Sequence, residues 1–216
     1  MASTLAEIWV AMTLVALGLH LWAEQRRWSV AIAVTKLIAS TGFLLTAHAV
    51  GALDHGWSRW LFVGLCLSWV GDACLLSRAR PAFLGGLVAF LLGHVAYCLA
   101  FWRYGVDASV ALTMVPPLLA CASLIERWLR PGLDTAMRGP VLAYIVVIST
   151  MLALAVGAWW AGASHLLLIG ALSFYLSDLF VARDRFVREE FFNRLCGLPA
   201  YYLGQICLAL AVLGLR

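Results

Sequence analysis

Charged residues are scarce in this chain, and their scarcity decides its class. Of its 216 residues only 12% are charged while 64% are hydrophobic, and the mean hydropathy is +0.94. Soluble domains carry about 25% charged residues and about 45–50% apolar ones. The composition excludes an ordinary soluble domain and predicts an integral membrane protein. No polar segment is long enough to form a second domain, so we expect one transmembrane domain over residues 1–216.

Motifs of several common site types are also missing. The six cysteines include no C-x-x-C pair, so we interpret them as small core residues. No H-x-x-x-H or H-E-x-x-H pattern offers the histidines of a zinc site, and no G-x-S-x-G marks a serine hydrolase. We therefore expect no metal and no cofactor. The arginines stand in short loops and not along one basic face, so the net charge of +4 does not indicate a nucleic-acid partner.

Stretches nearly free of charge predict the helices. A membrane-spanning helix needs about 17–25 residues, and eight stretches qualify, at about 5–22, 29–50, 59–76, 83–102, 107–125, 139–160, 164–182 and 196–214. The sequence Ala161-Gly162-Ala163-Ser164 divides a charge-free run that is too long for one helix, and Pro116-Pro117 should kink or break the fifth helix. The first stretch follows no basic residues, unlike a signal peptide, so we expect it to be retained. The predicted fold is all-α, with eight transmembrane helices in one bundle.

Arginine predicts the orientation of this bundle. Eleven arginines fall in the loops after the first, third, fifth and seventh helices, and three fall on the other side, at Arg59, Arg103 and Arg216. Basic residues collect in cytoplasmic loops. Both termini are therefore predicted on the non-cytoplasmic side, in the plasma membrane, which is the inner membrane of a bacterium.

A few polar residues nevertheless stand inside the apolar runs. The chain has a single lysine, Lys36, which lies within the second run, and Asp72 and Asp178 lie within the third and seventh. An unpaired charge in hydrocarbon costs about 2.5–3.5 kcal/mol even on lenient scales, and such residues therefore mark functional sites. At about 1.5 Å of rise per residue, these three residues and the further polar ones lie between the cytoplasmic interface and the midplane. The further residues are His94, Tyr97, Tyr201 and Gln205. We expect them to face one another in a pocket that opens toward the cytoplasmic leaflet.

Each residue also has a structural alternative. Lys36 could extend its amine toward the interface, and the aspartates could be ordinary residues of helix ends or could simply pair with the lysine. An aspartate at a helix C-terminus opposes the helix dipole, however, and two such placements ask for a functional reason. His94 could be a packed core histidine, Gln205 could join helices, and the tyrosines could be packing residues.

The order of these motifs resembles the lysoplasmalogenase (YhhN-like) family of membrane proteins. The matching segments are Gly71-Asp72-Ala73-Cys74-Leu75, Gly93-His94-Val95-Ala96-Tyr97, Leu176-Ser177-Asp178-Leu179 and Tyr201-Tyr202-Leu203-Gly204-Gln205, together with Lys36. The family often has proline after that lysine, where this chain has Leu37. The resemblance covers about residues 25–210. It implies eight transmembrane helices and hydrolysis of the vinyl ether bond of lysoplasmalogens to a fatty aldehyde and a glycerophospho-ethanolamine or -choline.

That chemistry suits two carboxyl groups. Protonating the outer vinyl carbon gives an oxocarbenium ion, which a second carboxylate stabilises while it deprotonates water, as in glycosidases. We assign Asp72 and Asp178 as this pair, without deciding which is the acid. Lys36 would bind a carboxylate or the lipid phosphate, and His94, Tyr97, Tyr201 and Gln205 would orient water or the headgroup. The expected partners are a lysophospholipid substrate and membrane lipids. One alternative is a transporter with a polar site near the midplane; another is a structural or sensor protein in which Lys36 only neutralises the aspartates.

Overall fold

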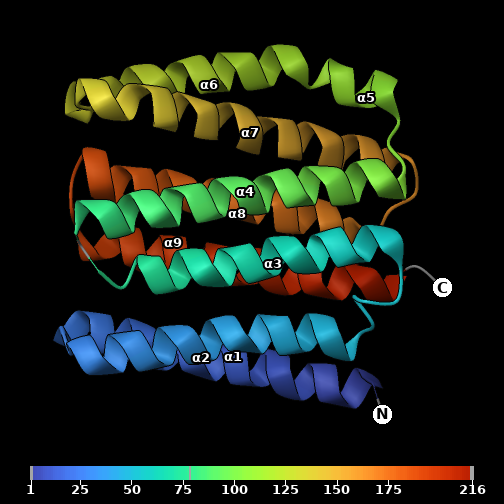
Figure 1. Cartoon of the computed structure of the whole chain (residues 1–216), viewed down its shortest axis with the longest axis horizontal. Helices are drawn as coiled ribbons and strands as arrows, with labels where there is room; N and C mark the ends of the chain where they lie inside the picture. Colours follow the sequence, from blue (N-terminus) through green and yellow to red (C-terminus); the bar gives the residue numbers. More distant parts are fainter. Residues whose placement is uncertain (1, 78, 215–216) are drawn as a thin grey trace.

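The computed structural model describes residues 2–77 and 79–214, and within these ranges it contains helices and no strand (Figure 1). The predicted all-α class is therefore confirmed. Two of the arginines counted for the orientation, Arg78 and Arg216, lie outside the described residues. The α-helices are α1 (Ala2–Arg26), α2 (Ser29–Ala49), α3 (Gly56–Cys74), α4 (Arg80–Tyr104), α5 (Ala108–Thr113), α6 (Val115–Leu129), α7 (Thr135–Trp160), α8 (His165–Phe186) and α9 (Phe191–Leu210), with short 3-10 turns at Arg130–Gly132 and Ala211–Gly214.

Both predicted breaks occur where the small residues and prolines stand. The fifth predicted helix is interrupted at Met114, and Pro116 and Pro117 follow in the first turn of α6, where a missing backbone N–H leaves no helical bond unmade. The long charge-free run ends at Trp160 and resumes at His165. Gly162 adopts a φ of 102° in that turn, a conformation that side chains disfavour.

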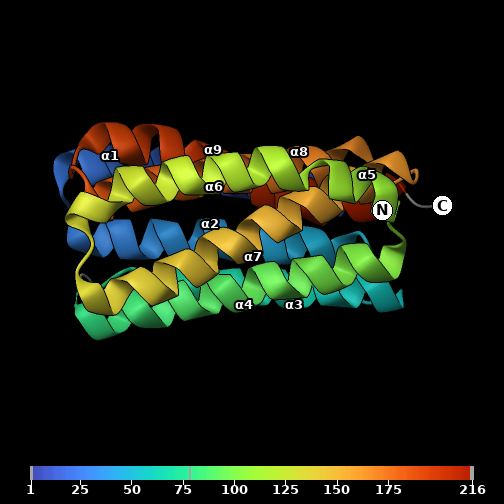
Figure 2. The same cartoon turned by 90° about the horizontal axis from the view of Figure 1, so that it is seen from above.

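Seven segments of the described chain are long and apolar enough to cross a membrane. They are α1, α2, α4, the α5–α6 segment, α7, α8 and α9. The helix α3 is not among them, because its 19 residues include three glycines, three tryptophans, two serines, Arg59 and Asp72. It nevertheless lies side by side with α4, and its axis is roughly aligned with the axes of the other helices (Figures 1 and 2). The protein is thus a polytopic membrane protein.

The helices pack mainly against their neighbours in sequence, and small residues bring some of them very close. Gly170 of α8 and Gly204 of α9 meet so tightly that a Cβ at position 204 would lie 3.0 Å from the carbonyl oxygen of residue 170. Figure 2 shows α7 crossing obliquely over α4. The main apolar core contains Phe43, Tyr97, Phe174 and their neighbours, and a smaller one joins α4, α6, α7 and α8.

The connections α1–α2, α3–α4, α6–α7 and α8–α9 all lie at one end of the bundle, which we call the loop end, and both termini lie at the other (Figure 1). The loops that the arginine count groups on one side of the membrane therefore lie at the same end of the molecule.

Candidate active site

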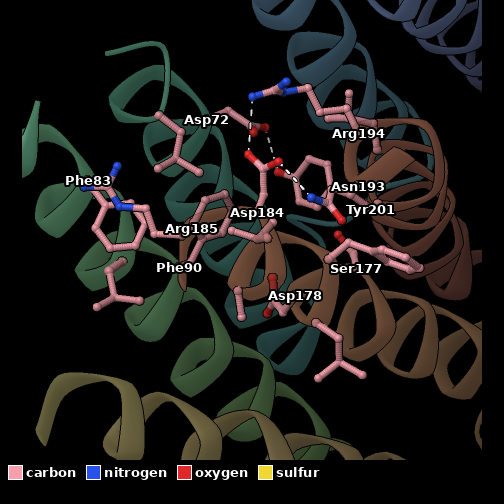
Figure 3. Close-up of a pocket in the computed structure, with 18 of the residues that line it drawn as sticks. Asp72, Phe83, Phe90, Ser177, Asp178, Asp184, Arg185, Asn193, Arg194 and Tyr201 are labelled. Atoms are coloured by element: carbon pink, nitrogen blue, oxygen red, sulfur yellow. Dashed lines mark hydrogen bonds and ion pairs between the residues drawn. The ribbon is translucent and has the colours of Figure 1, made fainter. Parts of the chain in front are cut away.

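A cavity of about 570 Å³ enters the bundle from the loop end. Such a volume is typical of small-molecule sites, which span about 300–1,000 Å³. One wall is polar and includes Lys36, Asp72 and Tyr201. The opposite wall is apolar and comes from α4, α6 and α7, with Phe83, Leu87, Ile125, Leu129, Val141, Ile145 and Ile148. Figure 3 shows Asp72 and Asp178 among the residues that line this cavity. A cavity with one polar and one apolar wall suits an amphipathic ligand.

Asp72 is held by three donors from two other helices. The Lys36 amine lies 3.2 Å from its Oδ1 atom, and the side chains of these two residues are 11% and 3% exposed. The hydroxyls of Ser40 and Tyr201 both donate to Oδ2, each at 2.6 Å. Lys36 and Ser40 reach the same carboxylate because residues four apart share one face of a helix. A cation and two hydroxyl donors around one carboxyl group are partners that suit a charged carboxylate.

Asp178 has a different set of partners. The Tyr144 hydroxyl of α7 donates to its Oδ2 atom at 2.8 Å, and the Nε2 atom of His94 lies 3.6 Å from the same oxygen. The Nδ1 atom of His94 lies 2.6 Å from the backbone carbonyl of Phe90, which can only accept, so Nδ1 carries the ring proton. In a neutral ring Nε2 is then an acceptor, and it has no hydrogen-bond partner within the described chain. Two acceptors thus face each other at 3.6 Å, an arrangement that a proton on either group relieves.

Tyr97 and Gln205 form a third group behind the cavity, which they do not line. The Tyr97 hydroxyl donates to the Gln205 side-chain oxygen at 2.9 Å and lies 3.3 Å from the Ser68 hydroxyl. The Gln205 amide nitrogen is buried and has no partner among residues 2–77 and 79–214. The ring of Phe174 packs between these groups, 4.5 Å from the His94 ring and 5.3 Å from the Tyr201 ring.

The alternative in which Lys36 neutralises both aspartates does not agree with this geometry. Within the part of the chain that the structure describes, Lys36 forms an ion pair with Asp72 and none with Asp178. The reason is the position of the helices: α2 and α3 place their polar groups on one side of the cavity, while Asp178 turns toward α4 and α7. Of the seven predicted residues, four line the cavity, namely Lys36, Asp72, Asp178 and Tyr201, while His94, Tyr97 and Gln205 lie behind the lining.

Several residues of the site escaped the sequence argument. Ser40 carries a signal that could have found it, because it follows Lys36 by one helical turn. Tyr144 stands in the otherwise aliphatic stretch 141–148, where a hydroxyl needs a partner, but nothing in the sequence says which one. Arg194 of α9 joins Glu24, Asp184 and Glu189 at 3.2–3.3 Å where the cavity reaches the loop end. These contacts link α1, α8 and α9, and only the folded chain brings them together.

The described residues contain no group of three or more His, Cys, Asp or Glu side chains that could hold a metal ion. The polar groups that line the cavity include the carboxylates of Asp72 and Asp178, the hydroxyls of Tyr144 and Tyr201, the Lys36 amine and the guanidinium groups of Arg185 and Arg194.

Comparison with known proteins gives one consistent match. The YhhN family matches residues 33–212 of this chain. The lysoplasmalogenase TMEM86B of Rattus norvegicus is 33% identical over 218 residues, which cover 95% of this chain and 84% of that protein. The lysoplasmalogenase TMEM86A of Bos taurus is 32% identical over 179 residues, or 80% and 73%. A lysoplasmalogenase of Mycobacterium bovis is 32% identical over 163 residues, or 69% and 58%. No solved structure matches this chain.

Proposed function

This chain belongs to the YhhN family, and from that premise we propose that it hydrolyses the vinyl ether bond of lysoplasmalogens by acid–base catalysis with Asp178 and Asp72. The similar proteins are lysoplasmalogenases, and the chain is accordingly a hydrolase of ether bonds. The observation that carries the mechanism is that two carboxyl groups with opposite surroundings line one amphipathic cavity. Pairs of carboxyl groups in contrasting environments divide naturally into an acid and a base.

Asp178 is the acid in this proposal. Its Oδ2 atom faces the Nε2 atom of His94 at 3.6 Å, and the pair is relieved when the carboxyl group carries a proton. No cation lies beside this carboxyl group within the described chain to hold it charged, because Lys36 pairs with Asp72. A neutral carboxylic acid in the cavity wall can donate its proton to the outer vinyl carbon. The product of that step is an oxocarbenium ion and the Asp178 carboxylate.

Asp72 is the base. Lys36, Ser40 and Tyr201 hold it as a carboxylate, and it stabilises the positive charge of the oxocarbenium ion through the cavity. Water adds to the cationic carbon, and its released proton goes to Asp72. The hemiacetal then collapses: its hydroxyl proton returns to Asp178, the carbon–oxygen bond to glycerol breaks, and Asp72 protonates the leaving glycerol oxygen. Both aspartates regain their starting states. The products are a fatty aldehyde and a glycerophospho-ethanolamine or -choline.

The remaining residues hold this arrangement. Tyr144 positions Asp178 through its hydroxyl, and the Nε2 atom of His94 can accept the proton that Asp178 carries. Tyr97 and Gln205 support the Tyr201 side of the bundle from behind the cavity. They act in this proposal as positioning residues, because they lie outside the cavity lining.

The orientation in the membrane is part of the same proposal. We place all of residues 1–216 in one transmembrane domain with eight crossings, because α3 runs alongside the seven apolar segments (Figure 1). The loop end carries the larger share of the arginines, so it faces the cytoplasm and both termini face outward. The cavity reaches that end and opens toward the cytoplasmic leaflet of the plasma membrane.

Aldehyde release by the purified protein in liposomes tests this function. We expect the wild-type protein to release aldehyde from a lysoplasmalogen, and Asp178→Asn and Asp72→Asn to abolish the release while still inserting into the membrane and folding at the assay temperature. Asp107→Asn, at an exposed helix start outside the cavity, is the matched control and should retain full activity. Uptake of the lipid into vesicles without aldehyde release would instead support a transporter, and full activity of either cavity variant would remove that aspartate from the mechanism.

A further inference from the structure

Among the arginines of residues 183–194, one has no carboxylate partner within the described part of the chain. Four arginines stand in the last turn of α8, the following loop and the first turn of α9, and three of them, Arg183, Arg188 and Arg194, form ion pairs with acidic residues. Arg185 forms none within residues 2–77 and 79–214 and lines the cavity. Its guanidinium carbon lies 4.3 Å from the centre of the Phe83 ring. Figure 3 shows this pair at the side of the cavity, apart from the cluster around Arg194.

The contact with Phe83 orients a cation without neutralising it. A guanidinium group over an aromatic face keeps its N–H donors available at its edge. Those donors match the oxygens of a phosphate group in pairs, and charge-assisted pairs of this kind are the stronger hydrogen bonds of proteins. The lysine that could have bound a phosphate inside the cavity is already paired with Asp72 at 3.2 Å. Arg185 is therefore the cavity-lining cation that remains open to an anion.

We propose that Arg185 binds the phosphate of the lysophospholipid and thereby fixes the depth at which the lipid enters the cavity. This inference rests on the proposed function, because it takes the hydrolysed lipid as the ligand. The apolar wall from α4, α6 and α7 then receives the hydrocarbon chain, and the phosphate stays at the loop end.

The spacing along α8 agrees with the dimensions of such a lipid. Arg185 follows Asp178 by seven residues, which is about two helical turns and about 10 Å of rise, so both side chains project from the same face. An extended chain advances roughly 1.2 Å per bond, so the seven or so bonds from phosphorus to the outer vinyl carbon span about 8 Å. A phosphate held by Arg185 thus brings that carbon to the level of the Asp178 carboxyl group.

A binding measurement with lipids that cannot be hydrolysed tests the phosphate site without depending on catalysis. The probes are a 1-alkyl lysophosphoethanolamine and a 1-alkylglycerol of the same chain length, measured on the full chain in nanodiscs. We expect Arg185→Gln to weaken binding of the phosphate-bearing probe by about 10- to 100-fold, because a charge-assisted hydrogen-bond pair is lost. Binding of the alkylglycerol should stay within twofold. Arg185→Lys keeps the charge but loses the paired donors, and should fall between the two.

Arg188→Gln is the matched control, since Arg188 is also exposed and lies three residues further along the chain, but is paired with Glu190 and does not line the cavity. It should bind both probes as the wild-type protein does. Equal weakening of both probes by Arg185→Gln, or no weakening of either, would overturn the proposal. Inorganic phosphate separates two sources of the anion: if free phosphate binds the wild-type protein but not Arg185→Gln, while the two lipid probes bind the wild-type protein equally well, the site takes the free anion and the lipid assignment is overturned.

Kinetics distinguish a failure of this site from a failure of the proposed function. With lysoplasmalogen, Arg185→Gln should raise KM and change kcat less than about threefold, because the residue binds a group that does not react. A wild-type protein that binds the phosphate-bearing probe through Arg185 yet releases no aldehyde would contradict the hydrolase alone. If the wild-type protein releases aldehyde and Arg185→Gln has the same KM as the wild type, the phosphate site alone is contradicted.

Discussion

Replacing Lys36 by methionine removes the cation that faces Asp72 inside the bundle. The two side chains are 11% and 3% exposed and 3.2 Å apart, so the carboxylate left behind has little access to water. Breaking a buried ion pair on one side costs about 3–5 kcal/mol. Because Ser40 and Tyr201 still donate to that carboxylate, we expect the lower part of this range, about 3 kcal/mol. For a chain of this size the loss corresponds to roughly 6–12 °C in the midpoint of thermal unfolding.

The assay is thermal unfolding in detergent micelles of Lys36→Met, of Asp72→Asn and of the double variant. Each single change leaves one buried polar partner without its counterpart, whereas the double change removes both charges. We therefore expect the double variant to be more stable than either single one, with a coupling energy of about 2–3 kcal/mol. Arg80→Met is the matched control, because Arg80 and Asp134 are 3.1 Å apart but 57% and 55% exposed. It should change stability by less than about 1 kcal/mol.

Two results would contradict a buried, interacting Lys36–Asp72 pair. A Lys36→Met variant as stable as the control variant would mean that the pair is solvated like a surface pair. Strict additivity of the two single changes would mean that the lysine and the aspartate do not interact in the folded protein.

Three further outcomes follow from single contacts. Tyr144→Phe should lower kcat for aldehyde release by about tenfold, the loss of one hydrogen bond to the acid, and an unchanged kcat would contradict that contact. Gly71→Ala should destabilise the fold by about 1–3 kcal/mol, because the new Cβ would lie 2.5 Å from a phenylalanine ring, whereas Gly85→Ala, with its nearest atom at 3.6 Å, should not. The hydrogen bond from the Ser109 hydroxyl holds the pKa of Asp107 below its ordinary value, so the stability that the charged carboxylate contributes is lost as the pH falls. The melting midpoint of the wild type should therefore approach that of Asp107→Asn below about pH 4, and a constant difference between the two midpoints would contradict this.

Much of the fold follows from the sequence because charge is so costly in a membrane. The charge-free stretches predicted the order of the helices, and the prolines and Gly162 marked the two interruptions within them. Helix ends were less accessible: α4 begins at Arg80 and α8 continues to Phe186, so charged residues extend both helices beyond the apolar runs. The apolar length predicts what can cross a membrane, while backbone hydrogen bonds decide where a helix ends.

The sequence predicted part of the candidate site, but it did not predict which residues pair there. A lone lysine and two aspartates in apolar helices had to face one another or a wet cavity, and the structure places all three in the cavity lining. Which aspartate meets the lysine depends on how α2, α3 and α8 are turned about their axes, and the short apolar patterns of these helices do not determine that. Tyr144 entered the site for the same reason, because the rotation of α7 directs one hydroxyl of an aliphatic run at Asp178.

Hydrolysis in D₂O shows whether the enzyme protonates the outer vinyl carbon from an exchangeable carboxylic acid. The aldehyde is reduced to the alcohol as it forms, so that later exchange of its hydrogens is prevented, and its isotopic composition is read by mass spectrometry. We predict one deuterium on the carbon next to the former carbonyl, together with a slower turnover in D₂O and no product from Asp178→Asn. A product without deuterium at that carbon would show that the bond is cleaved by another route and would contradict the account.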